Sequence, residues 1–372
     1  MLIGVPKEIK TEEYRVALIP ATVSELASRG HDIAVESGAG NGAGISDDEY
    51  AAAGARIYAT ADRIFEEAEL IVKVKEPLAS ERKKLRRGQM IFTYLHLAPD
   101  PEQAKELLSS GVTAIAYETV TGPEGRLPLL APMSKVAGRM AIQVAAHFLE
   151  RPQGGRGILL GGVEGVAPAK VAILGGGVVG SSAAEVATGM GADVTVITRS
   201  AGTIQNLLHH FCGRIRAIAA DGETVEAVCT SADAVIGAVL VAGGATPKLL
   251  SARTVASMKP GAVIVDVSID QGGCAETSRP TTHATPTYLV DGVTHYCVAN
   301  MPGAVPRTST FALNNATRPF ILALADKGFP QAFIDDVHLR NGLNIHDGKV
   351  ACLAVASALK LPYVPAADVL GL

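Results

Sequence analysis

Three polar residues stand where apolar runs of the sequence end, and their side chains suit work on a small polar substrate. Lys75, His96 and Asp270 each close or directly follow such a run. A lysine holds a carboxylate or polarises a carbonyl group, and a histidine carries protons near neutral pH. An aspartate can orient a reacting group. Because ligands of open α/β sheets bind beyond the carboxyl ends of the strands, these residues are candidates for one site.

Spacing leaves competitors for each of these roles. Lys73 lies on the same strand face as Lys75, and Asp266 belongs to the same run as Asp270. A histidine at a strand end is more often a structural hydrogen-bonding group than a catalyst, so His96 alone defines nothing. Three other histidines fit no pattern: His283, His295 and His338. Residue type and spacing leave these choices open.

A glycine-rich turn gives a more specific signal. Gly175, Gly177 and Gly180 form a G-x-G-x-x-G pattern between an apolar run and a segment of small residues. The first glycine permits a tight turn, the second lets the backbone approach a pyrophosphate, and the third lets helix and strand pack closely. The N-terminus of the following helix supplies N–H groups for the phosphates. The pattern predicts a dinucleotide site and, with the residues above, a small-molecule dehydrogenase.

The end of the next apolar run bears on the choice of cofactor. An acid there accepts hydrogen bonds from the adenosine ribose 2′-hydroxyl and repels a 2′-phosphate. This sequence has Thr198, Arg199 and Ser200 instead. Arg199 either pairs with a 2′-phosphate or points into solvent. NAD is the default expectation, and the missing acid makes NADP plausible.

Short apolar runs alternate with segments of helical spacing, which is typical of βαβ organisation. The expected strands are 2–5, 32–36, 69–74, 90–95, 112–117, 170–174, 193–197, 234–236 and 262–267, and the expected helices include 21–28, 59–67, 136–150 and 313–327. A glycine-dense stretch at 151–168 marks a linker or hinge. The predicted fold class is α/β, with two Rossmann-like parallel-sheet domains. We expect residues 1–128 to begin a substrate domain, 129–306 to form an inserted dinucleotide domain, and 307–372 to add helices that return to the first.

The composition argues against several classes of partner. Of the 372 residues, 48% are hydrophobic and 19% charged, and the net charge is −4. No basic run appears and tryptophan is absent, so nucleic acid and membrane are poor partner predictions. The five scattered cysteines include no C-x-x-C pair, which favours reduced thiols. Without a signal-peptide layout or an apolar stretch near ~18 residues, we expect a cytoplasmic protein.

The segments themselves are familiar, and they resemble the alanine dehydrogenase family in order and in spacing. They are GVPKEIKTEEYRVALIP, VKVKEP, FTYLHLA, IAYETV, LPLLAPMS, QGGRGILLGGVEGVAPAKVAILGGGVVG, IGAVLV, VDVSIDQGGC and YCVANMPGAVPRTST. They cover most of the chain, from Met1 to about Thr317. The resemblance implies reversible oxidative deamination of L-alanine to pyruvate and ammonium with a nicotinamide cofactor, usually in a homohexamer.

The resemblance also implies roles for individual residues. Arg15 and Lys75 correspond to the residues that hold the substrate carboxylate and keto oxygen, which favours Lys75 over Lys73. His96 matches the proposed acid/base, and Asp270 matches the second catalytic residue beside the nicotinamide. Tyr94 and Asn300 are further candidates for substrate contact. Besides the three glycines, Asp270, Thr198 and Arg199, the cofactor-lining candidates are Ser134, Val178, Val179, Val239, Leu240, Val267, Asn300, Val298 and Met301.

Some positions depart from the family pattern. Thr198 stands where an acid is usual, and Ala220 lacks the hydroxyl expected against the adenosine. Lys327 stands where some relatives carry a metal-binding histidine, so no metal is expected. The main alternative is the NAD-binding subunit of a proton-translocating transhydrogenase, which would need a membrane partner. The intact DQGG and HL segments weigh against it. A non-catalytic dinucleotide sensor is the third possibility.

Overall fold

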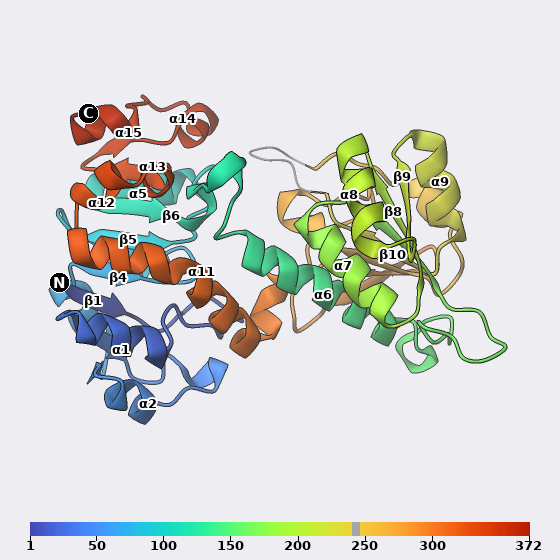
Figure 1. Cartoon of the computed structure of the whole chain (residues 1–372), viewed down its shortest axis with the longest axis horizontal. Coiled ribbons are helices and arrows are strands. Elements are labelled where there is room, and N and C mark those ends of the chain that lie inside the picture. The colour runs from blue at the N-terminus through green and yellow to red at the C-terminus, as the bar shows by residue number, and fades with distance from the viewer. Residues whose placement is uncertain (240–245) are drawn as a thin grey trace. The chain divides into compact units, whose positions relative to one another are not determined.

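The computed structural model describes residues 1–239 and 246–372. Its contacts divide the chain into two compact units. The first comprises Met1–Met133 and Gly303–Leu372, and the second comprises Ser134–Pro302. The sequence predicted the boundaries between the two domains after residues 128 and 306. The second unit is therefore a continuous segment that interrupts the first (Figure 1).

A sheet of eight strands forms the centre of the first unit. In spatial order the strands are β15 (Lys349–Val350), β14 (Leu343–His346), β6 (Thr113–Ala116), β5 (Met90–Thr93), β4 (Leu70–Val72), β1 (Leu2–Val5), β2 (Asp32–Glu36) and β3 (Arg56–Tyr58). The strands from β6 to β3 are parallel, whereas β14 and β15 extend one edge antiparallel. The parallel series has the strand order of a Rossmann sheet, with β1 at its centre.

Helices cover both faces of this sheet. They are α1 (Pro20–Ser28), α2 (Asp47–Ala52), α3 (Ala61–Glu67), α4 (Ala79–Arg82), α5 (Pro101–Ser110), α11 (Pro306–Lys327), α12 (Gln331–Asp335), α13 (Val337–Arg340), α14 (Leu353–Leu359) and α15 (Ala366–Leu370). The short 3₁₀ segments are η1 (Asn41–Ala43), η2 (Tyr117–Thr119), η3 (Pro123–Gly125) and η6 (Met301–Ala304). Ile64 of α3, Leu107 of α5 and Val355 of α14 belong to one buried apolar cluster against the sheet. Burial of this kind is the main stabilising term for a parallel sheet.

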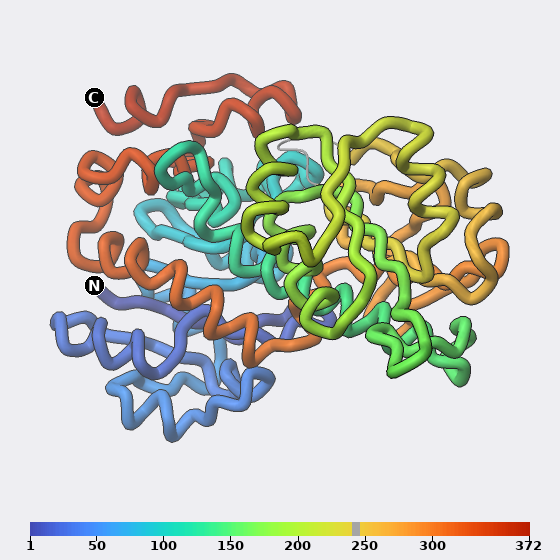
Figure 2. The backbone as a smooth tube through the Cα atoms, turned by 45° about the vertical axis from the view of Figure 1, so that its right-hand side comes forward, coloured from blue at the N-terminus to red at the C-terminus, as the bar shows by residue number. Residues whose placement is uncertain are grey.

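The C-terminal segment completes the first unit. Figure 2 shows the orange α11 beside the blue N-terminal part of the chain. Thr310 and Asn314 of α11 accept hydrogen bonds from the backbone N–H groups of Val16 and Ile19, at 3.2 and 3.1 Å. Asn314 also donates to the hydroxyl of Thr22 at 2.8 Å. The loop before α1 therefore takes its shape from residues almost 300 positions later.

The second unit repeats the same topology. Its seven strands lie in the order β12 (Thr287–Val290), β13 (Val293–Tyr296), β11 (Val263–Asp266), β10 (Ala234–Gly237), β7 (Lys170–Leu174), β8 (Asp193–Thr198) and β9 (Arg216–Ala219). All pairs are parallel except β12 with β13. The helical segments are α6 (Ala131–Phe148, which enters from the first unit), η4 (Arg151–Gln153), α7 (Val178–Gly189), α8 (Ala201–Phe211), α9 (Gly222–Ser231), α10 (Ala252–Ala256) and η5 (Val267–Gln271). Leu174, Val235 and Ile264 form part of the buried core.

The strands before the candidate residues end earlier than the sequence predicts. β4, β5 and β11 stop before Lys75, His96 and Asp270 are reached, so these residues lie in the segments that follow. The reason is visible in the hydrogen bonds, because side-chain carboxylates accept backbone N–H groups in these segments. Within residues 1–239 and 246–372, no helix is long and apolar enough to cross a membrane.

Candidate active site

The predicted residues of the first unit share one edge of its sheet. β1, β4 and β5 are parallel neighbours, so their carboxyl ends lie side by side. Arg15 lies in the segment after β1, Lys75 follows β4, and His96 follows β5. In sheets with this strand order the chain departs in opposite directions on the two sides of the first strand, which opens a crevice there. The topology therefore brings these three residues to the edge where a ligand binds.

The structure separates the two lysines that spacing could not. Lys73 is fully buried, and its ammonium lies 3.1 Å from a carboxylate oxygen of Glu8 and 2.8 Å from one of Glu81. Burial lowers the pKa of Lys73, but the two carboxylates outweigh it and hold that pKa above its ordinary value. Lys73 is thus a charged structural residue. Lys75 is only partly buried, as a ligand-binding side chain must be.

Glu8 links the segment after β1 to the segment after β4. One carboxylate oxygen accepts the N–H of Val74 at 2.6 Å and that of Lys75 at 3.4 Å, while the other contacts Lys73. Glu8 is 7% exposed, so water competes little for these bonds. The backbone at Lys75 is therefore fixed by a carboxylate from the neighbouring connection.

Arg15 is buried and tightly paired. Its Nε and Nη2 donate to the two carboxylate oxygens of Glu13 at 2.7 and 2.5 Å. Its Nη1 lies 3.1 Å from the sulfur of Met133, a weak acceptor. Burial lowers the pKa of the guanidinium, but Glu13 outweighs it and raises that pKa, with smaller support from Tyr94 and Glu8. A substrate carboxylate could replace the sulfur of Met133 as the partner of Nη1.

His96 sits in an unusual backbone conformation. Its φ is 49°, in the left-handed region that costs energy for residues other than glycine. Glu118 in η2 accepts the N–H of His96 at 2.6 Å and the N–H of Leu95 at 3.2 Å. The imidazole is exposed and stacks on Tyr94, with ring centroids 5.8 Å apart. An exposed imidazole on a pinned turn is suited to proton transfer.

Tyr94 is held more firmly than a substrate contact requires. Its hydroxyl donates to the backbone carbonyl of Leu129 at 2.5 Å, and its ring packs edge-on against Tyr117 at 5.0 Å. Burial raises the pKa of the Tyr94 phenol, so it stays protonated. The predicted substrate contact of Tyr94 therefore stays a prediction.

In the second unit the structure separates Asp266 from Asp270. Asp266 is fully buried, and its carboxylate accepts bonds from the N–H of Cys274 at 2.8 Å and the hydroxyl of Ser278 at 2.6 Å. It also accepts the N–H of Ser268 at 3.2 Å. Asp270 is exposed on η5, within the loop that these bonds close. Asp266 is thus the structural residue, and Asp270 is the one available to a ligand.

All three competing histidines have hydrogen-bonding partners. The Nε2 of His283 lies 3.3 Å from the carbonyl oxygen of Asn300. His295 is fully buried, with its ring nitrogens 2.8 Å from the hydroxyl of Thr277 and 3.1 Å from the carbonyl of Val293. The Nδ1 of His338 lies 3.0 Å from the hydroxyl of Thr121. These contacts favour the structural reading that spacing left open.

The glycine loop has the geometry that a dinucleotide needs. Gly175 has φ 109°, where side chains are strained. A Cβ on Gly180 would lie 1.9 Å from the carbonyl oxygen of Gly175, whereas a Cβ on Gly177 would meet nothing within 4 Å. Gly177 also precedes the first turn of α7 and offers no side-chain cap. The loop is therefore tight where helix and strand meet and open where a pyrophosphate would approach.

The residues predicted to face the adenosine follow β8, the neighbour of β7. Thr198 ends β8, and its carbonyl accepts the N–H of Ala220 at 3.1 Å. Ser200 caps α8 by accepting the N–H of Thr203 at 3.1 Å. Arg199 is exposed, and no ion pair involves it in the described part of the chain. An exposed arginine beside a helix N-terminus is compatible with a 2′-phosphate.

The remaining cofactor candidates follow the strands of the same sheet. Val239 follows β10, Val267 follows β11, and Val298 follows β13. Val178 and Val179 begin α7, Ser134 lies in α6, and Met301 begins η6, directly after Asn300 at φ 60°. Leu240 lies outside the described residues. Among those described, no group of three or more His, Cys, Asp or Glu side chains could hold a metal ion. Lys327 pairs with Asp335 at 2.7 Å.

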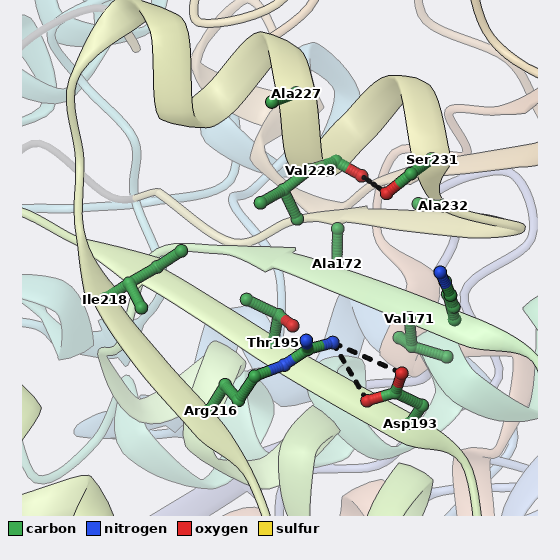
Figure 3. Close-up of a pocket in the computed structure, with 11 residues that line it drawn as sticks. Val171, Ala172, Asp193, Thr195, Arg216, Ile218, Ala227, Val228, Ser231 and Ala232 are labelled. Carbon is green, nitrogen blue, oxygen red and sulfur yellow. Dashed lines mark hydrogen bonds and ion pairs between the residues drawn. The ribbon is translucent and has the colours of Figure 1, made fainter.

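The units also contain cavities of different character. One of about 350 Å³ in the first unit is lined by Arg15 and by residues of 7–15 and 38–42. Figure 3 shows another, of about 220 Å³, between α9 and the strands β7 to β9. Its Arg216 and Asp193 pair at 3.0 and 3.2 Å. These residues begin their strands, so this second cavity lies at the edge of the sheet opposite the glycine loop.

Two Rossmann-type sheets, a glycine loop of this shape and polar residues at the carboxyl ends of the strands define an α/β oxidoreductase that binds a nicotinamide dinucleotide. Family models described as "Alanine dehydrogenase/PNT, N-terminal domain" and "Alanine dehydrogenase/PNT, C-terminal domain" match residues 4–137 and 141–352. The chain belongs to the alanine dehydrogenase/PNT family.

Individual relatives are similar along their whole length. An alanine dehydrogenase of Halomonas elongata is 58% identical over 371 residues, which cover 100% of both chains. A solved L-alanine dehydrogenase structure is 48% identical, covers 97% of this chain and 99% of its own, and has a TM-score of 0.94. A transhydrogenase structure from Sinorhizobium meliloti is 25% identical, covers 95% of this chain and 100% of its own, and has a TM-score of 0.82.

Sequence reasoning missed the carboxylates that hold the site. Glu8, Glu13 and Glu118 contact the candidate residues or their backbone. A signal for two of them was present, because Glu8 and Glu118 stand just after strands that end at the same sheet edge. A carboxylate in that position is easily read as another substrate ligand. Only the coordinates show that it binds neighbouring N–H groups.

Proposed function

We propose that the chain is an L-alanine dehydrogenase that interconverts L-alanine with pyruvate and ammonium. The observation that carries the proposal is the 58% identity along the whole of both chains to a protein of that name. The identity to the transhydrogenase structure is much lower, at 25%. The geometry of the first unit adds support, because two cations and an imidazole stand at one sheet edge.

Each candidate residue has a chemical task in this reaction. A nicotinamide, when bound, would supply the acceptor for the hydride that leaves the α-carbon of alanine. Arg15 and Lys75 bind the carboxylate and the developing keto oxygen, and so fix the orientation of the α-carbon. His96 removes the proton from the amine before oxidation and moves protons while water replaces the nitrogen. Asp270 is proposed as the second catalytic residue, as the resemblance to the family implies.

A direct assay tests the function. Purified protein is mixed with NADH or NADPH, ammonium and pyruvate, and the loss of nicotinamide absorbance is followed. Turnover that requires both pyruvate and ammonium is the expected result. His96→Ala should lower kcat by at least about 10²-fold, the lower range for a removed acid or base. Oxidation of NADH that ignores pyruvate and ammonium would refute the dehydrogenase proposal.

We further propose that the enzyme uses NADP(H) appreciably. The exposed Arg199 and the absence of an acid at Thr198 support this choice. One charge-assisted bond to a 2′-phosphate contributes about 1.5–3 kcal/mol, roughly 10- to 150-fold in affinity. Thr198→Asp should restore repulsion of the phosphate and shift the ratio of kcat/KM strongly toward NADH. A native enzyme that rejects NADPH by more than about 100-fold would contradict the role given to Arg199.

The assembly and the compartment are further proposals. We propose a homohexamer in the cytoplasm, as the resemblance to the family suggests. The cysteines are free, and Cys229, Cys274 and Cys297 are buried, which suits a reducing compartment. Light scattering coupled to size-exclusion chromatography measures the mass of the assembly directly.

A further inference from the structure

The carboxylate of Glu118 makes contacts that the reaction itself does not require. Its Oε1 accepts the N–H groups of both Leu95 and His96, at 3.2 and 2.6 Å, and its Oε2 lies 3.2 Å from the N of Leu95. Two successive amides therefore point at one carboxylate. Bonds of this type, with an ionised acceptor, are stronger than neutral ones.

The turn that receives these bonds would not hold its shape unaided. His96 has φ 49°, and residues other than glycine occupy this region only where their surroundings enforce it. On the other side of the turn, the side-chain amide of the buried Gln103 donates to the carbonyl of Leu95 at 2.5 Å. Glu118 therefore holds the peptide units around His96 through their N–H groups, and Gln103 holds them through the carbonyl of Leu95.

We propose that Glu118 is a positioning residue for the reaction, which acts by holding His96 in the left-handed turn that presents its imidazole to the substrate. This inference rests on the proposed function, because it takes His96 as the proton carrier. Glu118 reaches His96 through the backbone, and the stack of His96 on Tyr94 then fixes the plane of the ring at an angle of 11° to the phenol. Arg15 and Lys75 are held by other carboxylates, so substrate binding does not depend on Glu118.

The test is a double-mutant cycle with the whole enzyme. Glu118→Ala should lower kcat by roughly 10- to 100-fold, since misplacing a catalytic group by about 1 Å can cost about 10²-fold. The KM for pyruvate should change less than about threefold. In a His96→Ala background, Glu118→Ala should change kcat by less than about threefold, because two residues that act through one group are not additive. Glu118→Gln keeps one oxygen acceptor and should recover part of the rate.

Asp336 offers a matched control. Its Oδ1 also accepts two successive N–H groups, of His338 at 2.8 Å and Leu339 at 3.2 Å, but His338 has a structural partner and no proposed role in the reaction. Asp336→Asn should leave kcat near the native value. A similar loss in Asp336→Asn, or an equal effect of Glu118→Ala with and without His96, would show that Glu118 only stabilises the fold. Native kcat in both Glu118 variants would also overturn the proposal.

The cycle separates this inference from the proposed function. If His96→Ala alone retains the native rate, the role of His96 is wrong and the failure lies with the proposed function. If His96→Ala is slow but the Glu118 effect persists in that background, only the positioning role fails. If Glu118→Ala does not fold, the same cycle is measured with Glu118→Gln. Circular dichroism and the thermal unfolding transition of each variant report whether it is folded.

Discussion

Replacement of Lys73 by methionine should mainly lower the stability of the fold, whereas replacement of Lys75 by methionine should mainly lower the activity. Lys73→Met removes the cation that lies between the buried carboxylates of Glu8 and Glu81. Removing one partner from a buried ion pair costs about 3–5 kcal/mol, because the remaining charge has no compensation. Lys75 is only partly buried, and substitutions at such positions usually change stability by less than about 0.5 kcal/mol.

These energies convert into measurable melting temperatures. The first unit contains roughly 200 residues, a size at which 1 kcal/mol shifts Tm by about 2–4 °C. Lys73→Met should therefore lower the Tm by roughly 6–20 °C, and Lys75→Met by no more than about 2 °C. In the pyruvate assay Lys75→Met should lose most of its turnover. Lys73→Met, measured below its melting temperature, should keep more activity than Lys75→Met.

The stability deficit of Lys73→Met should also depend on pH. Burial raises the pKa of Glu8 even in the presence of Lys73, and loss of the cation raises it further. A carboxyl whose pKa is higher in the folded state stabilises the fold at low pH, and that contribution is lost as pH rises through the folded pKa. The difference in Tm between Lys73→Met and the native protein should be smaller at about pH 5.5 than at about pH 8. Equal melting of native and Lys73→Met at both pH values would refute the structural role of Lys73.

Two further substitutions test the framework of each unit. Gly180→Ala places a methyl group 1.9 Å from the carbonyl oxygen of Gly175 and should weaken NADH binding at least tenfold in a fluorescence titration. The control is Gly189→Ala, at the end of the same helix. Its methyl group would meet nothing within 4 Å, so it should bind NADH normally. Equal affinity of the two variants would contradict the loop geometry. Asn314→Ala leaves the N–H of Ile19 without its acceptor and should cost about 1–3 kcal/mol in a denaturant titration, and an unchanged midpoint would show that the contact with α11 is dispensable.

The architecture could be predicted from the sequence because its signals are local. The apolar runs at 2–5, 32–36 and 170–174 coincide with β1, β2 and β7, and the glycine pattern directly follows β7. Short elements such as β3, β9 and β12 gave no such signal, since strands of this length lack a clear period. The C-terminal helix 313–327 was predicted too short, because α11 begins at Pro306, where polar residues replace the apolar spacing.

The candidate site was less predictable than the fold. The sequence could place Lys75, His96 and Asp270 near strand ends, but it could not distinguish Lys73 or Asp266 from them. That distinction depends on partners distant in sequence, such as Glu8, which is 65 residues from Lys73. Contacts between residues so far apart in the chain produce no periodic pattern in the sequence. The left-handed turn at His96 could not be predicted either, because Glu118, which stabilises it, lies in the segment after another strand.

The attachment of the Arg15 loop to α11 has a consequence for synthesis of the chain on the ribosome. Apart from the first residues of α6, the second unit is encoded within residues 134–302, so it can begin to fold once that segment has emerged. The loop containing Val16 and Ile19 is made first, yet its hydrogen-bond partners in α11 are made after the entire second unit. The substrate end of the protein is therefore completed last. A nascent chain that has not yet reached α11 would carry an assembled dinucleotide fold and an unfinished substrate site.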